Sequence, residues 1–331
     1  GGCNIAMGVC ALRENTGSFN TALGTCSLLS NTTGASNVAL GYNTLYANTT
    51  GGGNVAVGEC ALYENTGVGG NTAVGQLSLF KNTTGTRNNA FGREALCTNT
   101  EGSYNNAMGY EALCKNTTGD NNTAVGHVSL FSNTTADNNT AVGQASLCAN
   151  TTGASNVAVG KDAMKANTTG TGNTAVGYLS LDANQTTSCN TAVGEGALTA
   201  NITNCNTAVG YYAGSATTTG GRNVFVGLQA GQANTTGALN TAIGEKASYT
   251  NITASSNTSL GHRALYTNVA SNNTAVGDSA LYANTTASNN TAVGYQSLFA
   301  NTTGTNNIAV GFSALDSNTT GEGNVAVGVQ A

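Results

Sequence analysis

The side chains that could support catalysis are few and scattered in this chain of 331 residues. Its two histidines, His127 and His262, lie far apart in the sequence. No serine, histidine and aspartate cluster, no pair of facing carboxylates and no phosphate-binding glycine loop before a helix can be built from the sequence. We therefore expect no enzyme activity, no catalytic residues and no cofactor.

Nine cysteines offer thiol chemistry instead. Metal binding is not expected, because no Cys-x-x-Cys motif occurs and histidine is nearly absent. Three pairs occupy equivalent places in neighbouring copies of a repeat, where the Cα separation suits a disulfide. The parallel Cβ directions would strain such a bridge, so free thiols remain an equal alternative. The candidate disulfides join Cys10 to Cys26, Cys97 to Cys114 and Cys189 to Cys205.

Asparagines followed by x-Ser/Thr offer a third chemistry, N-glycosylation. Asn15, Asn65, Asn99 and Asn268 occupy the same place in the repeat and keep the asparagine without the sequon. This favours a structural role in turns and side-chain ladders, with glycans as an alternative that could be added to it. The candidate glycosylation sites are Asn31, Asn48, Asn82, Asn116, Asn133, Asn150, Asn167, Asn184, Asn201, Asn234, Asn251, Asn284, Asn301 and Asn318.

All these residues belong to one tandem repeat, Asn-Thr-Ala-Val-Gly-x-x-Ala/Ser-Leu-x-x-Asn-Thr-Thr-Gly-x-x, whose positions we number 1 to 17. Nineteen complete units cover residues 4–323, and a partial unit covers 324–331. Sixteen of the complete units have 17 residues and three have 16. We expect residues 1–331 to form a single continuous repeat array, and we expect it to be a segment of a longer chain.

A 17-residue unit is too short for a pair of helices and suits one coil of a β-solenoid. Its valine, threonine and aromatic residues favour strands, whereas glycine and asparagine favour turns. Proline, which cannot donate a backbone hydrogen bond to a ladder, is absent from the sequence. The sequence therefore predicts an all-β parallel β-roll of about twenty coils, each with two short strands.

Stacking turns each repeat position into a column of equivalent residues. Position 5 is always glycine, which predicts a positive φ or a very close backbone approach. Position 4 is always apolar and position 9 is mostly leucine, so we expect both columns to face the interior. Position 3 is almost always alanine and would then face outward, which predicts an oligomer interface that includes Ala124, Ala141 and Ala158. The alternative is that the glycine at position 5 breaks the alternation and both columns point inward.

Two further columns suggest alternative binding functions. Position 10 is often aromatic, as at Tyr46 and Phe299, and we expect this column to be partly exposed. It would serve packing between chains or coils, or alternatively carbohydrate stacking. Threonine recurs at positions 13 and 14, and a regular threonine array on a rigid solenoid is an alternative surface for binding ice.

Composition narrows the classes of partner. Lys and Arg total 10 against 15 Asp and Glu, and the resulting net charge of −5 argues against nucleic-acid binding. No apolar run approaches the roughly 18 residues of a membrane helix, so we expect no membrane insertion in this segment.

The recurring Asn-Thr-Ala-Val-Gly-x-x-Ala/Ser-Leu unit over residues 4–331 resembles the repeats of phage and virus tail-fibre proteins and of trimeric autotransporter adhesin heads. The resemblance implies a left-handed parallel β-roll of three chains around one axis. It also implies a structural fibre or adhesin segment outside the cell, on a cell or virion surface, that attaches to a cell-surface or glycan receptor. No receptor-binding residue carries over, because the matching positions are structural.

Overall fold

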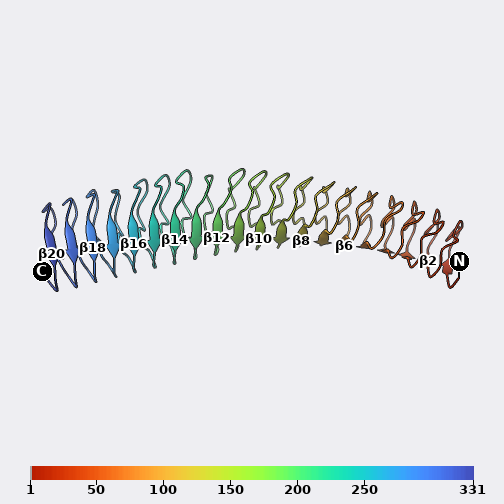
Figure 1. Cartoon of the computed structure of the whole chain (residues 1–331), viewed down its shortest axis with the longest axis horizontal. Helices are drawn as coiled ribbons and strands as arrows, with labels where there is room; N and C mark the ends of the chain where they lie inside the picture. Colours follow the sequence, from red (N-terminus) through yellow and green to blue (C-terminus); the bar gives the residue numbers. More distant parts are fainter. Residues whose placement is uncertain (1) are drawn as a thin grey trace. The chain divides into compact units, whose positions relative to one another are not determined.

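The computed structural model describes residues 2–331, and within them every repeat forms one coil with a single short strand (Figure 1). Each strand occupies repeat positions 2 to 4 and is three residues long. The chain divides into two compact units, one ending at Thr171 and one running from Gly172 to Ala331. No helix occurs in the described residues. The fold is thus all-β, as predicted.

The first unit contains ten strands: β1 (Ile5–Met7), β2 (Thr21–Leu23), β3 (Val38–Leu40), β4 (Val55–Val57), β5 (Thr72–Val74), β6 (Asn89–Phe91), β7 (Asn106–Met108), β8 (Thr123–Val125), β9 (Thr140–Val142) and β10 (Val157–Val159). The second unit contains another ten: β11 (Thr174–Val176), β12 (Thr191–Val193), β13 (Thr207–Val209), β14 (Val224–Val226), β15 (Thr241–Ile243), β16 (Thr258–Leu260), β17 (Thr274–Val276), β18 (Thr291–Val293), β19 (Ile308–Val310) and β20 (Val325–Val327).

Within each unit consecutive strands pair in parallel and in register. Ala22 of β2 faces Ala39 of β3, and Ala192 of β12 faces Ala208 of β13. This confirms a parallel β-solenoid with a 17-residue repeat. The prediction of two strands per coil is wrong, because the other half of each coil consists of turns. These turns still bond from coil to coil, as when Leu28 N donates to Thr44 O at 3.0 Å.

The invariant glycine at position 5 follows each strand and meets both predicted requirements. Its φ lies between 122° and 145° in every coil, a region that L-residues rarely adopt. A Cβ added to Gly24 would also lie 2.3 Å from the carbonyl oxygen of Gly41 in the next coil. Any side chain here would therefore both strain the backbone and push two coils apart.

The interior of each coil is lined by positions 3 and 9. Ala141 and Leu147 are fully buried, whereas the flanking Thr140 and Val142 of the same coil are partly exposed. The prediction for position 9 is confirmed, but that for position 4 is wrong. Strand alternation holds in the opposite sense from the one expected: the small alanine points inward, and positions 2 and 4 point outward. In most coils an alanine methyl group and the leucine of position 9 share the interior.

The predicted interface through the alanine column must be corrected for the same reason. Ala124, Ala141 and Ala158 are fully buried within their own chain. They pack beneath the sheet and have no surface to offer a second chain. Any association of chains must use other residues.

One coil exchanges volume between the two interior columns. Phe225 replaces the alanine of position 3 and is fully buried. Position 9 is glycine in the same coil and in the preceding one. A Cβ on Gly214 would lie 2.6 Å from Phe225 Cδ2, and one on Gly231 would lie 2.3 Å from Phe225 Cδ1. The phenyl ring therefore fills the space that leucines occupy in most coils. The replacement of leucine by glycine at position 9 of the same coil is the feature of the sequence that indicates this exchange.

Candidate functional site

The asparagines of positions 1 and 12 form two ladders that run from coil to coil, and the position-12 ladder is interrupted in the second unit at Thr217, whose Oγ1 has no hydrogen-bond partner. In the position-12 ladder, Asn133 Nδ2 donates to Asn116 Oδ1 at 2.9 Å and to Ala136 O at 3.0 Å. In the position-1 ladder, the backbone N of Asn139 donates to Asn122 Oδ1 at 2.9 Å. Each coil is thus joined to its neighbours by buried side-chain hydrogen bonds in addition to the backbone pairs.

These ladders occupy the atoms that a glycan would need. Thirteen of the fourteen sequon asparagines are at most 1% exposed, and the fourteenth, Asn318, donates its Nδ2 to Asn301 Oδ1 and Gly321 O. A sugar joined to Nδ2 would have to enter the interior of the coil and break the ladder. The structural interpretation of this column therefore accounts for it, and the folded chain has no room for glycans at the buried thirteen.

The cysteines are all free thiols in the structure. Of the candidate pairs, Cys97 and Cys114 lie on adjacent coils, are half-buried and share a thiol–thiol hydrogen bond. This bond lowers the pKa of Cys97 and raises that of Cys114, because Cys97 is the member that holds the negative charge. Cys189 and Cys205 are exposed, and Cys10 and Cys26 are partly exposed.

The two histidines both occupy position 6, one in each unit, and make different contacts. His127 stacks on Tyr110 with ring centroids 5.3 Å apart. His262 Nδ1 lies 3.1 Å from Asp278 Oδ2, and Ser279 donates its hydroxyl to the other carboxylate oxygen of Asp278. These bonds lower the pKa of Asp278. The carboxylate stands between the imidazole and the hydroxyl, so the imidazole has no contact through which to activate the serine as a nucleophile.

The aromatic residues of position 10 form stacked ladders and are half-buried, as expected. Tyr249, Tyr266, Tyr282 and Phe299 follow one another with centroid spacings of 5.1 to 5.2 Å and nearly parallel planes. Each ring covers the face of the next, which leaves mainly ring edges toward solvent. Carbohydrate stacking needs an open ring face, so this ladder fits packing between coils better than sugar binding.

The threonines of position 13 are also engaged within the stack. Thr117 Oγ1 donates to Thr134 O at 3.0 Å, and Thr134 Oγ1 donates to Thr151 O at 3.2 Å. Their hydroxyls serve the coil-to-coil ladder. The threonines of position 14, such as Thr118 and Thr135, form a single exposed column. The two adjoining threonine columns therefore do not make the flat array of free hydroxyls that ice binding was expected to use.

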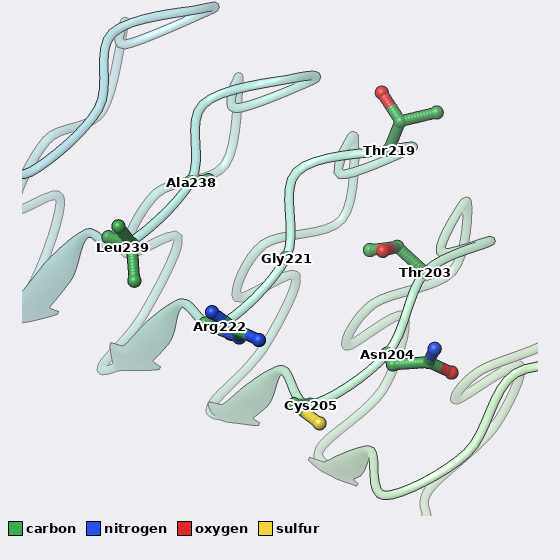
Figure 2. Close-up of a pocket in the computed structure, with 8 residues that line it drawn as sticks. All are labelled: Thr203, Asn204, Cys205, Thr219, Gly221, Arg222, Ala238 and Leu239. Atoms are coloured by element: carbon green, nitrogen blue, oxygen red, sulfur yellow. The ribbon is translucent and has the colours of Figure 1, made fainter.

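A groove of about 460 Å³ lies on the outer surface of the second unit, across three neighbouring coils (Figure 2). It results from local shortening: the coil that begins at Asn190 has 16 residues, and Asn201 Nδ2 reaches Thr203 O two residues on. The exposed guanidinium of Arg222 supplies its one positive charge. The groove is lined by Thr203, Asn204, Cys205, Thr219, Gly221, Arg222, Ala238 and Leu239. Sequence reasoning missed it, although the missing residue was the available signal.

The groove lacks the parts of a hydrolytic or acid–base centre. Its lining contains one thiol, two hydroxyls, one amide and one guanidinium, and it contains neither a carboxylate nor an imidazole. The amide of Asn204 already accepts the backbone N–H of Ser188 at 2.7 Å. The arrangement offers polar contacts to a small molecule and no general base for the thiol.

Metal-binding side chains and membrane-spanning helices were two further candidates in the described part of the chain. No group of three or more His, Cys, Asp or Glu side chains is placed there to hold a metal ion. Residues 2–331 contain no helix of the length and apolar character needed to cross a bilayer.

No protein-family model matches the sequence, and no curated protein matches it either.

Proposed function

We propose that this chain is a structural segment of a fibre or adhesin that acts outside the cell, on a cell or virion surface, without enzymatic activity. Copies of the chain associate in parallel along their length, and the fibre attaches to a cell-surface or glycan receptor. The resemblance to tail-fibre and adhesin-head repeats supports the location, a left-handed winding and an assembly of three chains. No cofactor, nucleic acid or membrane insertion is part of the proposal.

The observation that carries this proposal is the set of hydrogen-bond ladders that run from coil to coil inside each unit. The coil that begins at Asn122 pairs with its neighbours through its strand, through the turn at Leu130, through Asn133 and through Thr134. A load along the stack must therefore break several buried hydrogen bonds at once in each coil. Stacks of this kind gain stability additively from neighbour to neighbour, which suits a mechanical element.

The chemistry available at the surface agrees with a structural role. The groups with catalytic potential, such as His127, His262 and Cys205, stand on separate coils and lie at or near the surface. The polar side chains that are buried, chiefly the asparagines, are bonded to other coils rather than aimed at a cavity.

Single-molecule pulling on the full chain tests the mechanical part. The expected trace unravels coil by coil, and each step releases 17 residues, or roughly 55 to 60 Å of chain at about 3.4 Å per residue. An Asn133→Ala variant should lower the force of the steps at its own coil and at the two coils that it bonds to, and leave the others unchanged. Unfolding of the whole chain in one weak event would argue against a load-bearing segment.

Attachment requires its own assay. Beads coated with the chain should bind host cells, and soluble chain should compete with them. Beads that bind no better than beads coated with a neutral protein would remove the adhesin part and leave the structural part standing.

A further inference from the structure

The groove on the second unit holds the only charge of a long neutral stretch. Arg222 is the one charged residue between Glu195 and Glu245. Its side chain is exposed, and none of the ion pairs in the described residues includes it. The chain as a whole carries a net charge of −5, so a positive charge without a counter-charge is an exception on its surface. Such a charge in a concave place attracts an anionic group.

The shortened coil opens the groove beside this arginine. Thr203 O accepts Nδ2 of Asn190 at 2.9 Å and Nδ2 of Asn201 at 2.8 Å. In a regular coil these two bonds go to the residue of position 15, so Thr203 takes that position. The residue missing from the shortened coil is therefore the one at position 14, where the next coil keeps Thr219. The loss leaves a step between the two coils.

Small residues form the floor of the groove. Gly221 and Ala238 occupy position 16 in two successive coils. A Cβ on Gly221 would lie 3.3 Å from Thr203 Oγ1, so the absence of a side chain keeps this space open. Figure 2 shows the threonines on one side of this floor, with the side chains of Arg222 and Leu239 on the other. The volume of about 460 Å³ lies within the approximately 300 to 1,000 Å³ of small-molecule sites.

Neutral hydrogen-bonding groups surround the arginine. The hydroxyls of Thr203 and Thr219 make no hydrogen bond within the part of the chain that the structure describes. Asn204 Oδ1 accepts the backbone N–H of Ser188, which leaves its Nδ2 as a donor. Hydroxyls both donate and accept, as the hydroxyls of a sugar ring do. The groove thus combines one cation, three neutral polar groups and an apolar side chain, the exposed Leu239.

We propose that this groove binds a sugar residue that carries a carboxylate. The Arg222 guanidinium pairs with the carboxylate through two N–H donors. The two threonine hydroxyls and the Asn204 amide bond to ring hydroxyls, and Leu239 covers C–H groups of the ring. An inorganic anion would use the arginine alone and leave the other groups without a role. The inference rests on the proposed attachment to a glycan receptor, and it names the sugar chemistry and the site.

A single site of this kind binds weakly. Ion pairs at exposed positions contribute little, so we expect a dissociation constant of about 1 to 10 mM for one sugar residue. Parallel copies of the chain would present several grooves to one glycan-bearing surface. Simultaneous binding at these grooves then raises the overall affinity without new contacts.

The test measures protection of Cys205, a thiol in the lining of the groove, from alkylation. Full chain is treated with iodoacetamide in the presence of methyl glucuronide or methyl N-acetylneuraminide, and mass spectrometry follows each cysteine. Methyl glucoside is the matched neutral sugar, since it differs from the glucuronide only at the carboxylate. Cys3 is the internal control, because it is exposed and belongs to the other unit.

At least one of the acidic sugars should slow alkylation of Cys205 with a dissociation constant of about 1 to 10 mM and leave Cys3 unaffected. Methyl glucoside should bind at least about fivefold more weakly than the glucuronide, because it offers the arginine no charge. Raising the salt concentration from about 0.1 to 1 M should weaken the binding of the acidic sugars.

Two arginines at position 17 give a matched pair of variants. Arg222 and Arg87 are both exposed, with φ of 60° and 56°. Arg222→Gln should raise the dissociation constant of the bound acidic sugar about 5- to 10-fold, whereas Arg87→Gln should leave it unchanged. Ala238→Tyr fills the groove without changing the charge and should also weaken binding. Circular dichroism verifies that each variant is folded, and other coils accept the larger Thr86 and Asp137 at position 16.

Several results would overturn the inference. They are no protection by either acidic sugar up to about 50 mM, equal protection by the glucoside, and an unchanged dissociation constant in folded Arg222→Gln. Protection by sodium acetate at the same concentrations would reduce the groove to a general anion site and overturn the assignment to a sugar. The pulling and bead assays use none of these sugars. A chain that bears load and binds cells without protection of Cys205 would therefore fail this inference alone.

Discussion

Removing the phenyl ring of Phe225 should destabilise its own coil and the one before it. The ring is fully buried and occupies space left by glycines at positions 214 and 231. Phe225→Ala restores the usual alanine but leaves a cavity where neither leucine is present. Burial losses and cavities of this kind cost about 3 to 5 kcal/mol.

Returning the leucines should rescue this variant. Gly214 and Gly231 both have a φ of 58°, close to the φ of 51° at Leu198 and at Leu281, so leucine fits the backbone that already exists there. In the wild-type background, Gly231→Leu should cost about 1 to 3 kcal/mol, because its Cβ would already lie 2.3 Å from the ring. The triple variant Phe225→Ala, Gly214→Leu, Gly231→Leu should return to within about 1 kcal/mol of wild type, which is a strong coupling.

Hydrogen exchange followed by mass spectrometry is the suitable assay, since a repeat array need not unfold in one cooperative step. The opening free energy of residues 206–239 should fall in Phe225→Ala and in Gly231→Leu and recover in the triple variant. A matched control, Leu198→Ala, removes a buried leucine at position 9 without such a partner, so Gly231→Leu should not rescue it. If the triple variant is as unstable as the sum of its parts, the volume exchange does not exist.

Three further predictions concern the backbone, the asparagine ladder and the thiols. Ser155 is exposed and has a φ of 59°, so Ser155→Gly should raise the free energy of unfolding by up to about 1 kcal/mol. Ser132 lies outside the positive-φ region, so Ser132→Gly should lower the free energy of unfolding. Thermal unfolding measures both changes, and changes of the same sign would contradict this prediction. Asn133→Ala removes hydrogen bonds to Asn116 and Ala136 and should lower the free energy of unfolding in denaturant by about 2 to 4 kcal/mol. Thr135→Ala on the exposed position-14 column should lower it by less than about 0.5 kcal/mol. Equal losses in the two variants would contradict a ladder role for Asn133. The pKa of Cys97 is lowered, whereas burial raises the pKa of the half-buried Cys148, so Cys97 should hold more thiolate at neutral pH and be alkylated faster by iodoacetamide. Cys114→Ala should abolish this difference in alkylation rate. An unchanged rate at Cys97 in that variant would refute the thiol hydrogen bond.

The glycine column and the asparagine columns were the part of this fold that could be predicted from sequence. The glycine of position 5 has one physical use, and both of its predicted constraints are present at Gly24. The conserved asparagine without a sequon at Asn65 predicted a ladder, and Asn65 Nδ2 does donate to Asn48 Oδ1 at 3.0 Å. Periodicity therefore sufficed for the coil and for its polar interior.

The direction of the strand could not be predicted in the same way. Alanine and valine are both apolar, so hydrophobicity does not tell which of Ala141 and Val142 points inward. The answer depends on the width of the coil, in which Ala141 and Leu147 are both fully buried. That width is a property of the whole coil path, including the left-handed turns at positions 7 and 9, and a single strand does not reveal it. The misplaced interface followed from this one ambiguity.

The orientation of the strand is tested most directly by one comparison of two adjacent residues. Ala141→Glu places a carboxylate in the interior, and Val142→Glu places it on the surface. Thermal unfolding followed by circular dichroism should show that the first variant loses the fold or unfolds at a much lower temperature, while the second keeps it with little change in stability. A stable, folded Ala141→Glu chain beside an unfolded Val142→Glu chain would show that the coil is built the other way round.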